Sequence, residues 1–78
     1  MQKKRTFTAI IEREDNMYVS LCPELDVASQ GATIEDARAN LTEAVELFLE
    51  TASKSEIKER THNEVLITRL EVLVGKAA

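Results

Sequence analysis

The 78-residue chain has few of the residues that reinforce small folds. Its single cysteine, Cys22, excludes an internal disulfide, and the absence of a cysteine and histidine cluster excludes a structural metal site. A domain of this length buries only roughly 60% of the surface that its unfolded chain exposes. We therefore expect one domain over residues 1–78, with a core from 6 to 74, that gains stability from self-association or from a partner.

The chain also lacks an excess of basic residues and any long hydrophobic run. Ten basic and fourteen acidic residues give a net charge of −4, which argues against a general nucleic-acid binder. No apolar run approaches the ~20 residues of a membrane span, and the N-terminus lacks the apolar core of a signal peptide. These absences predict a cytoplasmic protein that does not enter a membrane. One alternative is a homo-oligomeric nucleic-acid-binding or regulatory protein that uses the basic residues Lys3, Lys4 and Arg5.

Three short segments have the composition of β-strands. Residues 6–12 and 17–22 are rich in β-branched and aromatic residues, and the polar residues 14–16 between them suit a turn. The two segments therefore predict a hairpin. Pro23 either ends the second strand or lies at a sheet edge, because it has no amide hydrogen to donate to a ladder. Residues 27–30 predict a third short strand, which Gly31 ends.

One long amphipathic helix follows these strands. At ~100° per residue, one broad apolar face contains Ile34, Ala37, Leu41, Ala44, Val45, Phe48, Leu49 and Ala52. Thr33 is placed to cap this helix, and Asp36 occupies the acidic position of a capping box. Residues 53–63 are polar and predict either a short second helical turn or a loop.

The last segment, residues 65–74, is a β-branched run that predicts a strand returning to the sheet, and a return after the helix allows it to lie parallel to the first strand. The order β-β-β-α-β predicts an α+β fold of two layers, with an antiparallel meander, one long helix and a returning C-terminal strand. Apolar residues occupy both faces of the last strand, whereas one helix covers only one face of a sheet. We therefore expect a homo-oligomer, a dimer or tetramer, with an interface that includes Val65, Ile67 and Leu73.

Residues that could carry catalysis are sparse. His62 is the only histidine, and no basic residue flanks Cys22 to make it reactive. The acidic residues at turns and at the helix start have no spacing diagnostic of a two-metal site, and no glycine-rich phosphate loop is present. The sequence predicts a protein that is not an enzyme and that needs no cofactor or metal.

A row of glutamates on the helix is one candidate for partner binding. The three residues are spaced i, i+3 and i+7, so they line up on the polar face. They form either a solvated surface or an electronegative one that steers a basic protein. The row consists of Glu43, Glu46 and Glu50.

The connector 23–27 is a second candidate. It carries two carboxylates, Glu24 and Asp26, with Leu25 between them. It is either a connection whose Leu25 packs into the core or a recognition loop on a rigid scaffold.

A series of short motifs in this order resembles a known family. The motifs are Tyr18-Val19-Ser20, Cys22-Pro23-Glu24-Leu25, Ser29-Gln30-Gly31-Ala32-Thr33 and Glu35-Asp36-Ala37, followed by Asn40-Leu41 and Glu43-Ala44. Together they resemble the HicB-like antitoxin family over residues 6 to about 50. The resemblance implies a partial RNase H-like fold without that fold's nuclease site; a vestigial nuclease is the remaining enzymatic alternative.

The resemblance also implies a function. A member of this family would bind a small basic mRNA-cleaving toxin of the HicA type and cover its active face. Full-length relatives usually carry a C-terminal DNA-binding domain, but only four residues follow the last predicted strand, so we expect no such domain here. The residues expected to bind the partner are Tyr18, Glu24, Asp26, Glu43, Glu46 and Glu50.

Overall fold

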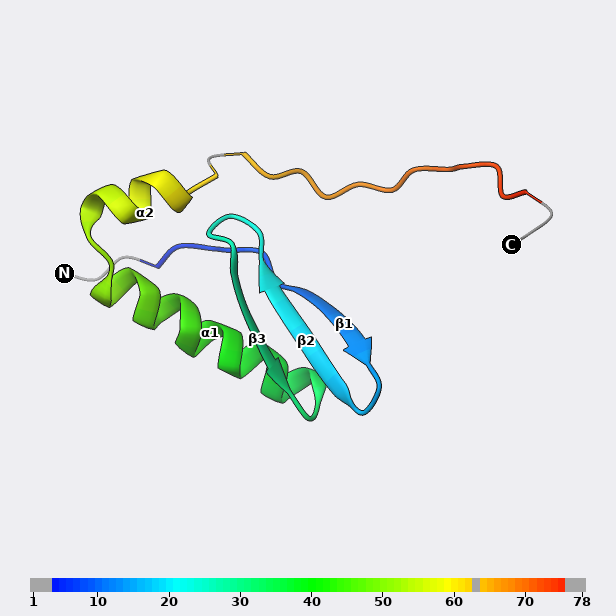
Figure 1. Cartoon of the computed structure of the whole chain (residues 1–78), viewed down its shortest axis with the longest axis horizontal. Helices are drawn as coiled ribbons and strands as arrows, with labels where there is room; N and C mark the ends of the chain where they lie inside the picture. Colours follow the sequence, from blue (N-terminus) through cyan, green and yellow to red (C-terminus); the bar gives the residue numbers. More distant parts are fainter. Residues whose placement is uncertain (1–3, 63, 76–78) are drawn as a thin grey trace.

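The computed structural model describes residues 4–62 and 64–75, and it shows a three-stranded sheet followed by two helices (Figure 1). The sheet is antiparallel with the strand order β1-β2-β3. This arrangement confirms the predicted α+β class and the antiparallel meander followed by a long helix. The elements are β1 (Ile10–Glu14), β2 (Met17–Cys22), β3 (Val27–Gly31), α1 (Ile34–Thr51) and α2 (Lys54–Arg60).

The turns of the meander are short and polar, as the sequence predicts. Glu14 pairs with Met17, so the first turn has only two residues, and Asp15 adopts a φ of 53°. Asp26 is the last of the four residues between β2 and β3, and it has a φ of 56°. Aspartate tolerates this left-handed region better than most residues, which explains its use at both turns.

The first strand begins later than the sequence predicts. It starts at Ile10 rather than at Thr6. The amide of Thr8 donates to the carboxylate of Glu24, with distances of 3.0 and 3.1 Å to its two oxygens. The Glu24 side chain, rather than a neighbouring strand, therefore accepts the hydrogen bond from the Thr8 backbone.

Side-chain caps set the starts of both helices. The hydroxyl of Thr33 accepts a hydrogen bond from the amide of Asp36 at 3.0 Å, as the capping motif predicts. Ser53 caps α2 in the same way through the amide of Glu56. Of the two alternatives predicted for the polar residues 53–63, a short helix or a loop, the structure shows a short helix.

Small residues let α1 lie close to one face of the sheet. The hydroxyl of Ser20, which is fully buried, donates to the carbonyl of Ala37 at 2.9 Å. A Cβ atom at Gly31 would lie only 2.6 Å from the carbonyl carbon of Asp36, so no larger residue fits there without movement. The helix packs chiefly against β3 and β2 and much less against β1. The core between the layers comprises Cys22, Leu25, Leu41 and Val45, with Phe7, Val27, Phe48 and Leu49 packed around it.

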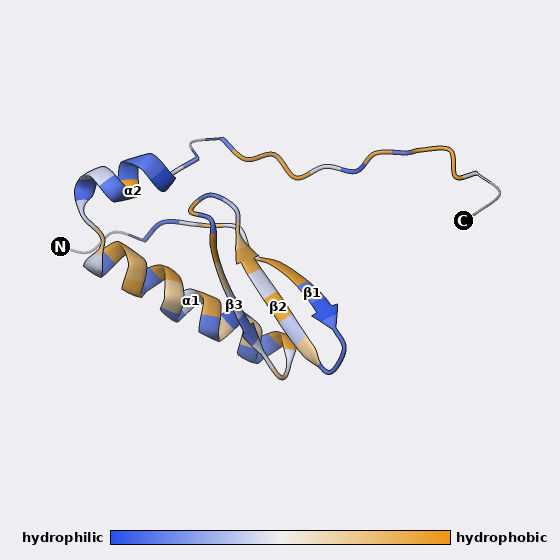
Figure 2. Cartoon of the chain, viewed as in Figure 1, coloured by the Kyte–Doolittle hydropathy of each residue, from blue (hydrophilic) through white to orange (hydrophobic). Residues whose placement is uncertain are grey.

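Neither α1 nor α2 covers the other face of the sheet. Because side chains alternate along a strand, the neighbours of the buried Ser20 and Cys22 point away from α1. The register places Ile10 and Ala28 beside Leu21 on that side. We call Ile10, Met17, Val19, Leu21 and Ala28 the open sheet face; its apolar positions alternate along β2 in Figure 2.

The predicted return of the C-terminal strand to its own sheet is not present in this structure. Residues 64–75, which we call the C-terminal arm, contain no strand and run away from the sheet (Figure 1). The radius of gyration is accordingly 15.5 Å, against about 12 Å for a compact chain of this length. A strand needs a partner for its amides and carbonyls, and α1 gives little cover beside β1, where the return would occur.

Neither helix in the described residues combines the length and the apolar character that crossing a lipid bilayer requires.

Candidate functional site

Glu24 holds the N-terminal segment to the connector. Its carboxylate accepts two hydrogen bonds from the Thr8 amide and one of 2.6 Å from the Thr8 hydroxyl. Desolvation by partial burial acts to raise the pKa of Glu24, but the hydrogen bonds from Thr8 outweigh it and hold the pKa below its ordinary value. The amide and the hydroxyl of Thr8 already bind this carboxylate, so the structure gives Glu24, predicted as a partner-binding residue, a role inside the fold.

Cys22 lies beside this carboxylate and is fully buried. Its thiol lies 3.5 Å from a Glu24 oxygen as a donor. Burial raises the pKa of the Cys22 thiol, and the neighbouring carboxylate raises it further. A protonated, enclosed thiol is a poor nucleophile, which agrees with the absence of a flanking basic residue that would make Cys22 reactive.

The remainder of the connector divides between the core and the surface. Leu25 is only 1% exposed, which confirms that this side chain packs into the core. Asp26 is exposed, and its backbone carbonyl lies 3.5 Å from the Arg60 guanidinium of α2. The Asp26 carboxylate is therefore the group of this connector that faces solvent.

The glutamate row of α1 lies on the outer surface of the helix. All three side chains are exposed, as the helical spacing predicts, and the last turn of α1 contains no basic residue. Negative charge near a helix C-terminus is unfavourable because it meets the negative end of the helix dipole. Glu50, which lies in the last turn, thus carries a small cost to stability. The members of the row are Glu43, Glu46 and Glu50.

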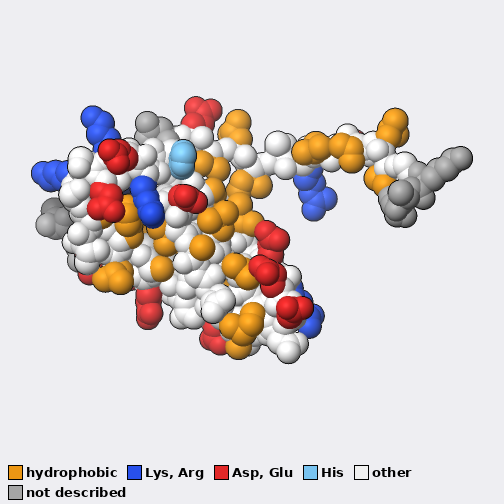
Figure 3. All heavy atoms as spheres, viewed as in Figure 1, with side chains coloured by type: hydrophobic (Ala, Val, Ile, Leu, Met, Phe, Trp, Pro, Cys, Tyr) orange, Lys and Arg blue, Asp and Glu red, His pale blue; other side chains and the backbone are white. Residues whose placement is uncertain are grey.

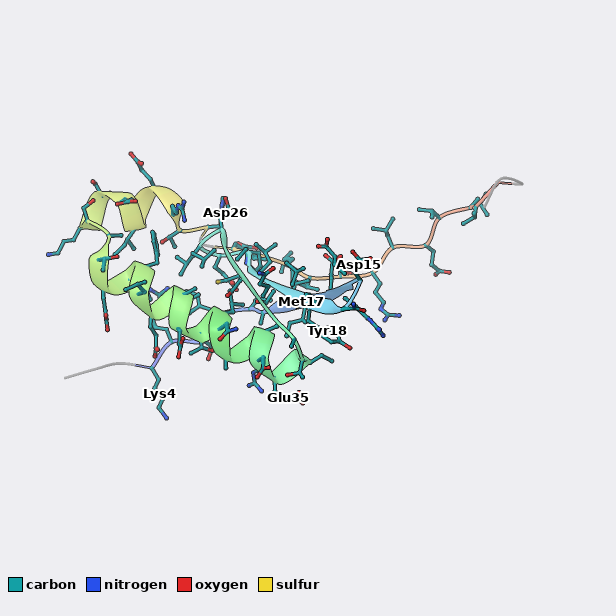
Figure 4. The ribbon with its side chains drawn as sticks, turned by 60° about the horizontal axis from the view of Figure 1, so that its bottom comes forward. Lys4, Asp15, Met17, Tyr18, Asp26 and Glu35 are labelled. Carbon is teal, nitrogen blue, oxygen red and sulfur yellow. The ribbon has the colours of Figure 1, made fainter. Side chains whose placement is uncertain are left out.

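Tyr18 lies at a different end of the sheet. It is half-buried and lines a shallow hollow where α1 begins, together with Arg13, Thr33 and Glu35. Figure 4 shows it near the hairpin turn, whereas Asp26 lies at the opposite end of the strands. The predicted partner-binding residues therefore occupy three separate places: the hairpin end, the connector and the outer face of α1.

The alternative nucleic-acid site is only partly described. Lys3 lies outside the described residues, while Lys4 and Arg5 are exposed. The Arg5 guanidinium lies 5.1 Å from the centroid of the Phe7 ring, a cation–π distance. One of its basic groups thus contacts the chain itself.

The predicted oligomer interface falls on the C-terminal arm. Val65 is half-buried near the domain, whereas Ile67 is 62% exposed and Leu73 is fully exposed. Ile67 and Leu73 are therefore accessible to another molecule, whereas the described part of the domain partly covers Val65.

The sequence did not predict the role of Thr8, and it predicted an uncovered sheet face without indicating which residues form it. Thr8 lies 16 residues from Glu24, and no local pattern joins the two. The alternation of β2 indicated two faces, but either set of alternate residues could have faced the helix. Ser20 and Gly31 are small enough to let α1 approach, so the side that carries Ser20 faces the helix.

Metal ligands do not gather in the described part of the chain. In residues 4–62 and 64–75, no three histidine, cysteine, aspartate or glutamate side chains come together as a metal ion would require.

The chain is similar to several bacterial proteins of one family. It is 36% identical over 70 residues to a UPF0150 protein of Synechocystis, covering 87% of each chain. A UPF0150 protein of Helicobacter pylori is 32% identical over 65 residues, which is 82% of this chain and 90% of the relative. One from Thermotoga maritima is 42% identical over 52 residues, 63% of this chain and 69% of the relative.

No family model matches the chain, and no solved structure matches it. The relatives nevertheless align with it over most of their length and of its own. The chain belongs to the UPF0150 family.

Proposed function

We propose that this chain is a small cytoplasmic binding module of the antitoxin type, which neutralises a basic mRNA-cleaving toxin of the HicA class. The resemblance of its motifs to the HicB-like family supplies the class of partner. The observation that carries the proposal is the exposed glutamate row of α1, which has no basic residue in the last turn to offset it. A net charge of −4 supports attraction to a basic protein.

The glutamate row would act by replacing RNA phosphates on the toxin. A ribonuclease that binds mRNA needs a basic surface, and three aligned carboxylates offer that surface an alternative ligand. Exposed ion pairs contribute only about 0.2–1 kcal/mol each. The row would therefore speed association and fix orientation, while the area covered would provide most of the affinity.

The connector would provide a second contact. Asp26 presents its carboxylate to solvent, and Glu24 fixes the shape of the loop behind it through Thr8. In this proposal Glu24 is a positioning residue, whereas Asp26 and the glutamate row touch the partner. Tyr18 would contact it only if the covered surface extends to the hairpin end.

The partial RNase H-like fold is part of the same proposal. The three-stranded meander and α1 supply its first four elements. The C-terminal arm would provide the fifth element when it forms a strand paired with a β1 edge.

Co-expression of the chain with a HicA-type toxin tests this function. Growth should be protected, and the purified proteins should form a complex whose affinity falls as salt rises. Glu46→Lys should weaken the complex several-fold because it puts a positive charge in the centre of the row.

A matched control separates the row from net charge. Glu59→Lys makes the same change on the exposed surface of α2, away from the row, and should leave binding near the wild-type value. Equal losses in the two variants would refute a specific role for the row. Failure of the wild-type chain to bind or inhibit the toxin would refute the function.

A further inference from the structure

We propose that the C-terminal arm pairs as an added strand with the β1 edge of a second copy of this chain, which returns its own arm to the first copy. The proposal concerns self-assembly and stands independently of the toxin as partner. It rests on the exposure of the arm, the state of the two sheet edges and the fit between the arm and β1.

The arm has the composition of a buried strand but the exposure of a surface. Leu66 is 80% exposed and Leu73 is fully exposed, although residues of this type are usually inside. Figure 3 shows hydrophobic side chains along the arm where it leaves the domain. An extended apolar segment of this kind is stable only when other chain atoms cover it. Its exposed large apolar residues are Leu66, Ile67, Leu70, Val72, Leu73 and Val74.

The arm begins beside the segment that leads into β1 but does not pair with that strand. Val65 and Phe7 line the same hollow, so a return within the chain would need no long connection. Such a return would place the arm beyond β1, where α1 gives little cover, and its apolar faces would stay in water. In a reciprocal exchange both arms enter one interface, where the second copy can cover them.

The two edges of the sheet differ in their readiness to accept a strand. On the β3 edge, the side-chain amide of Asn40 donates to the carbonyl of Gln30 at 2.7 Å, so α1 already occupies an acceptor there. Among the described residues, no hydrogen bond from outside the sheet reaches the backbone of β1. An unpaired strand edge is a template for a further strand. The β1 edge is therefore the acceptor.

The side chains of the arm match β1 in a parallel register. Ile10 and Glu12 lie on one face of β1, and Ile67 and Arg69 lie on one face of the extended arm. With Ile67 beside Ile10, Arg69 lies beside Glu12, so an apolar pair is followed by an ion pair. In an antiparallel pairing that keeps Arg69 beside Glu12, Glu71 would lie beside Ile10 instead. Cross-strand pairs of these kinds stabilise a sheet, which favours the parallel arrangement.

Disulfide trapping between separate chains tests this register. Ile10→Cys and Ile67→Cys are purified separately, mixed in equal amounts and incubated with oxidised glutathione, which is reduced as the protein disulfide forms. We expect a mixed disulfide between the two variants, because exchange brings the two positions together in different chains. Cys22 is fully buried, and oxidised wild-type protein shows whether it contributes.

An off-register pair provides the matched control. Leu73→Cys lies on the same face of the arm but about 20 Å further along an extended strand than position 67. Mixed with Ile10→Cys, it should give several-fold less mixed disulfide. Equal yields from the two mixtures would overturn the proposed register. Circular dichroism of each variant confirms that the fold is retained.

Two further results decide between exchange and closure within one chain. Light scattering should give the wild-type chain twice its mass of 8.7 kDa, and a mass of one chain at high concentration would overturn the proposal. The double variant Ile10→Cys, Ile67→Cys should form disulfides between chains at high concentration. Disulfides formed only within a chain at every concentration would also overturn it.

Discussion

Glu24 couples the stability of the fold to pH. Its pKa lies below the ordinary value of 4.5, so the ionised carboxylate stabilises the folded chain. This stability is fully present above the unfolded pKa and is lost as pH falls through the lower folded pKa. We therefore predict that the free energy of unfolding in urea falls as pH drops below about 4.5, and that Glu24→Gln makes this fall smaller.

The control for this prediction is another glutamate with no such contact. Glu59 is exposed on α2, and Glu59→Gln should keep the wild-type dependence of stability on pH. If Glu24→Gln and wild type lose the same free energy between neutral and acidic pH, the bonds from Thr8 do not stabilise the fold.

At the scale of elements, Gly31 sets how closely α1 approaches the sheet. A Cβ atom there would collide with the backbone of the first helical turn. Backbone moves less readily than a flexible side chain, so we predict that Gly31→Ala lowers the free energy of unfolding by about 1–3 kcal/mol. Urea denaturation followed by circular dichroism measures the loss.

The second glycine is the natural control for this substitution. A Cβ atom at Gly75 would have no neighbour within 4 Å, so Gly75→Ala should change stability by less than about 0.5 kcal/mol. Similar losses at both positions would show that backbone freedom, rather than the close approach of α1, is what Gly31 provides.

The elements that the sequence predicted well are those that local chemistry determines. Thr33 and Asp36 mark the start of α1, and the period of the helix places Glu46 on its outer face, because both signals lie within a few residues. The start of β1 depends on the distant contact between Thr8 and Glu24. The partner of the arm depends on an edge that no pattern within residues 65–74 identifies. The surface position of the glutamate row was therefore predictable, whereas the internal role of Glu24 was not.

At the scale of the whole molecule, the proposed exchange makes self-association depend on one cross-strand charge pair. Arg69→Glu would place two negative charges together at Glu12, and like charges directly opposite destabilise a sheet. We predict a several-fold weaker dimer, with association restored by the second change Glu12→Arg. Sedimentation or light scattering over a range of concentrations measures both.

A charge reversal elsewhere serves as the comparison. Lys58→Glu makes the same change on the exposed surface of α2 and should leave the dimer unaffected. A double variant no stronger than Arg69→Glu alone would contradict the pairing of Glu12 with Arg69.

The hydrogen bond from Asn40 to Gln30 has a consequence for the size of any assembly. Sheets that can recruit strands at two edges grow into open-ended polymers, and such growth is a route to fibres. In the described part of this chain, the long helix holds one edge, which leaves one edge to receive and one arm to give. Reciprocal exchange between two copies then uses both arms and both β1 edges, so the assembly closes as a dimer, whereas head-to-tail exchange would continue from copy to copy.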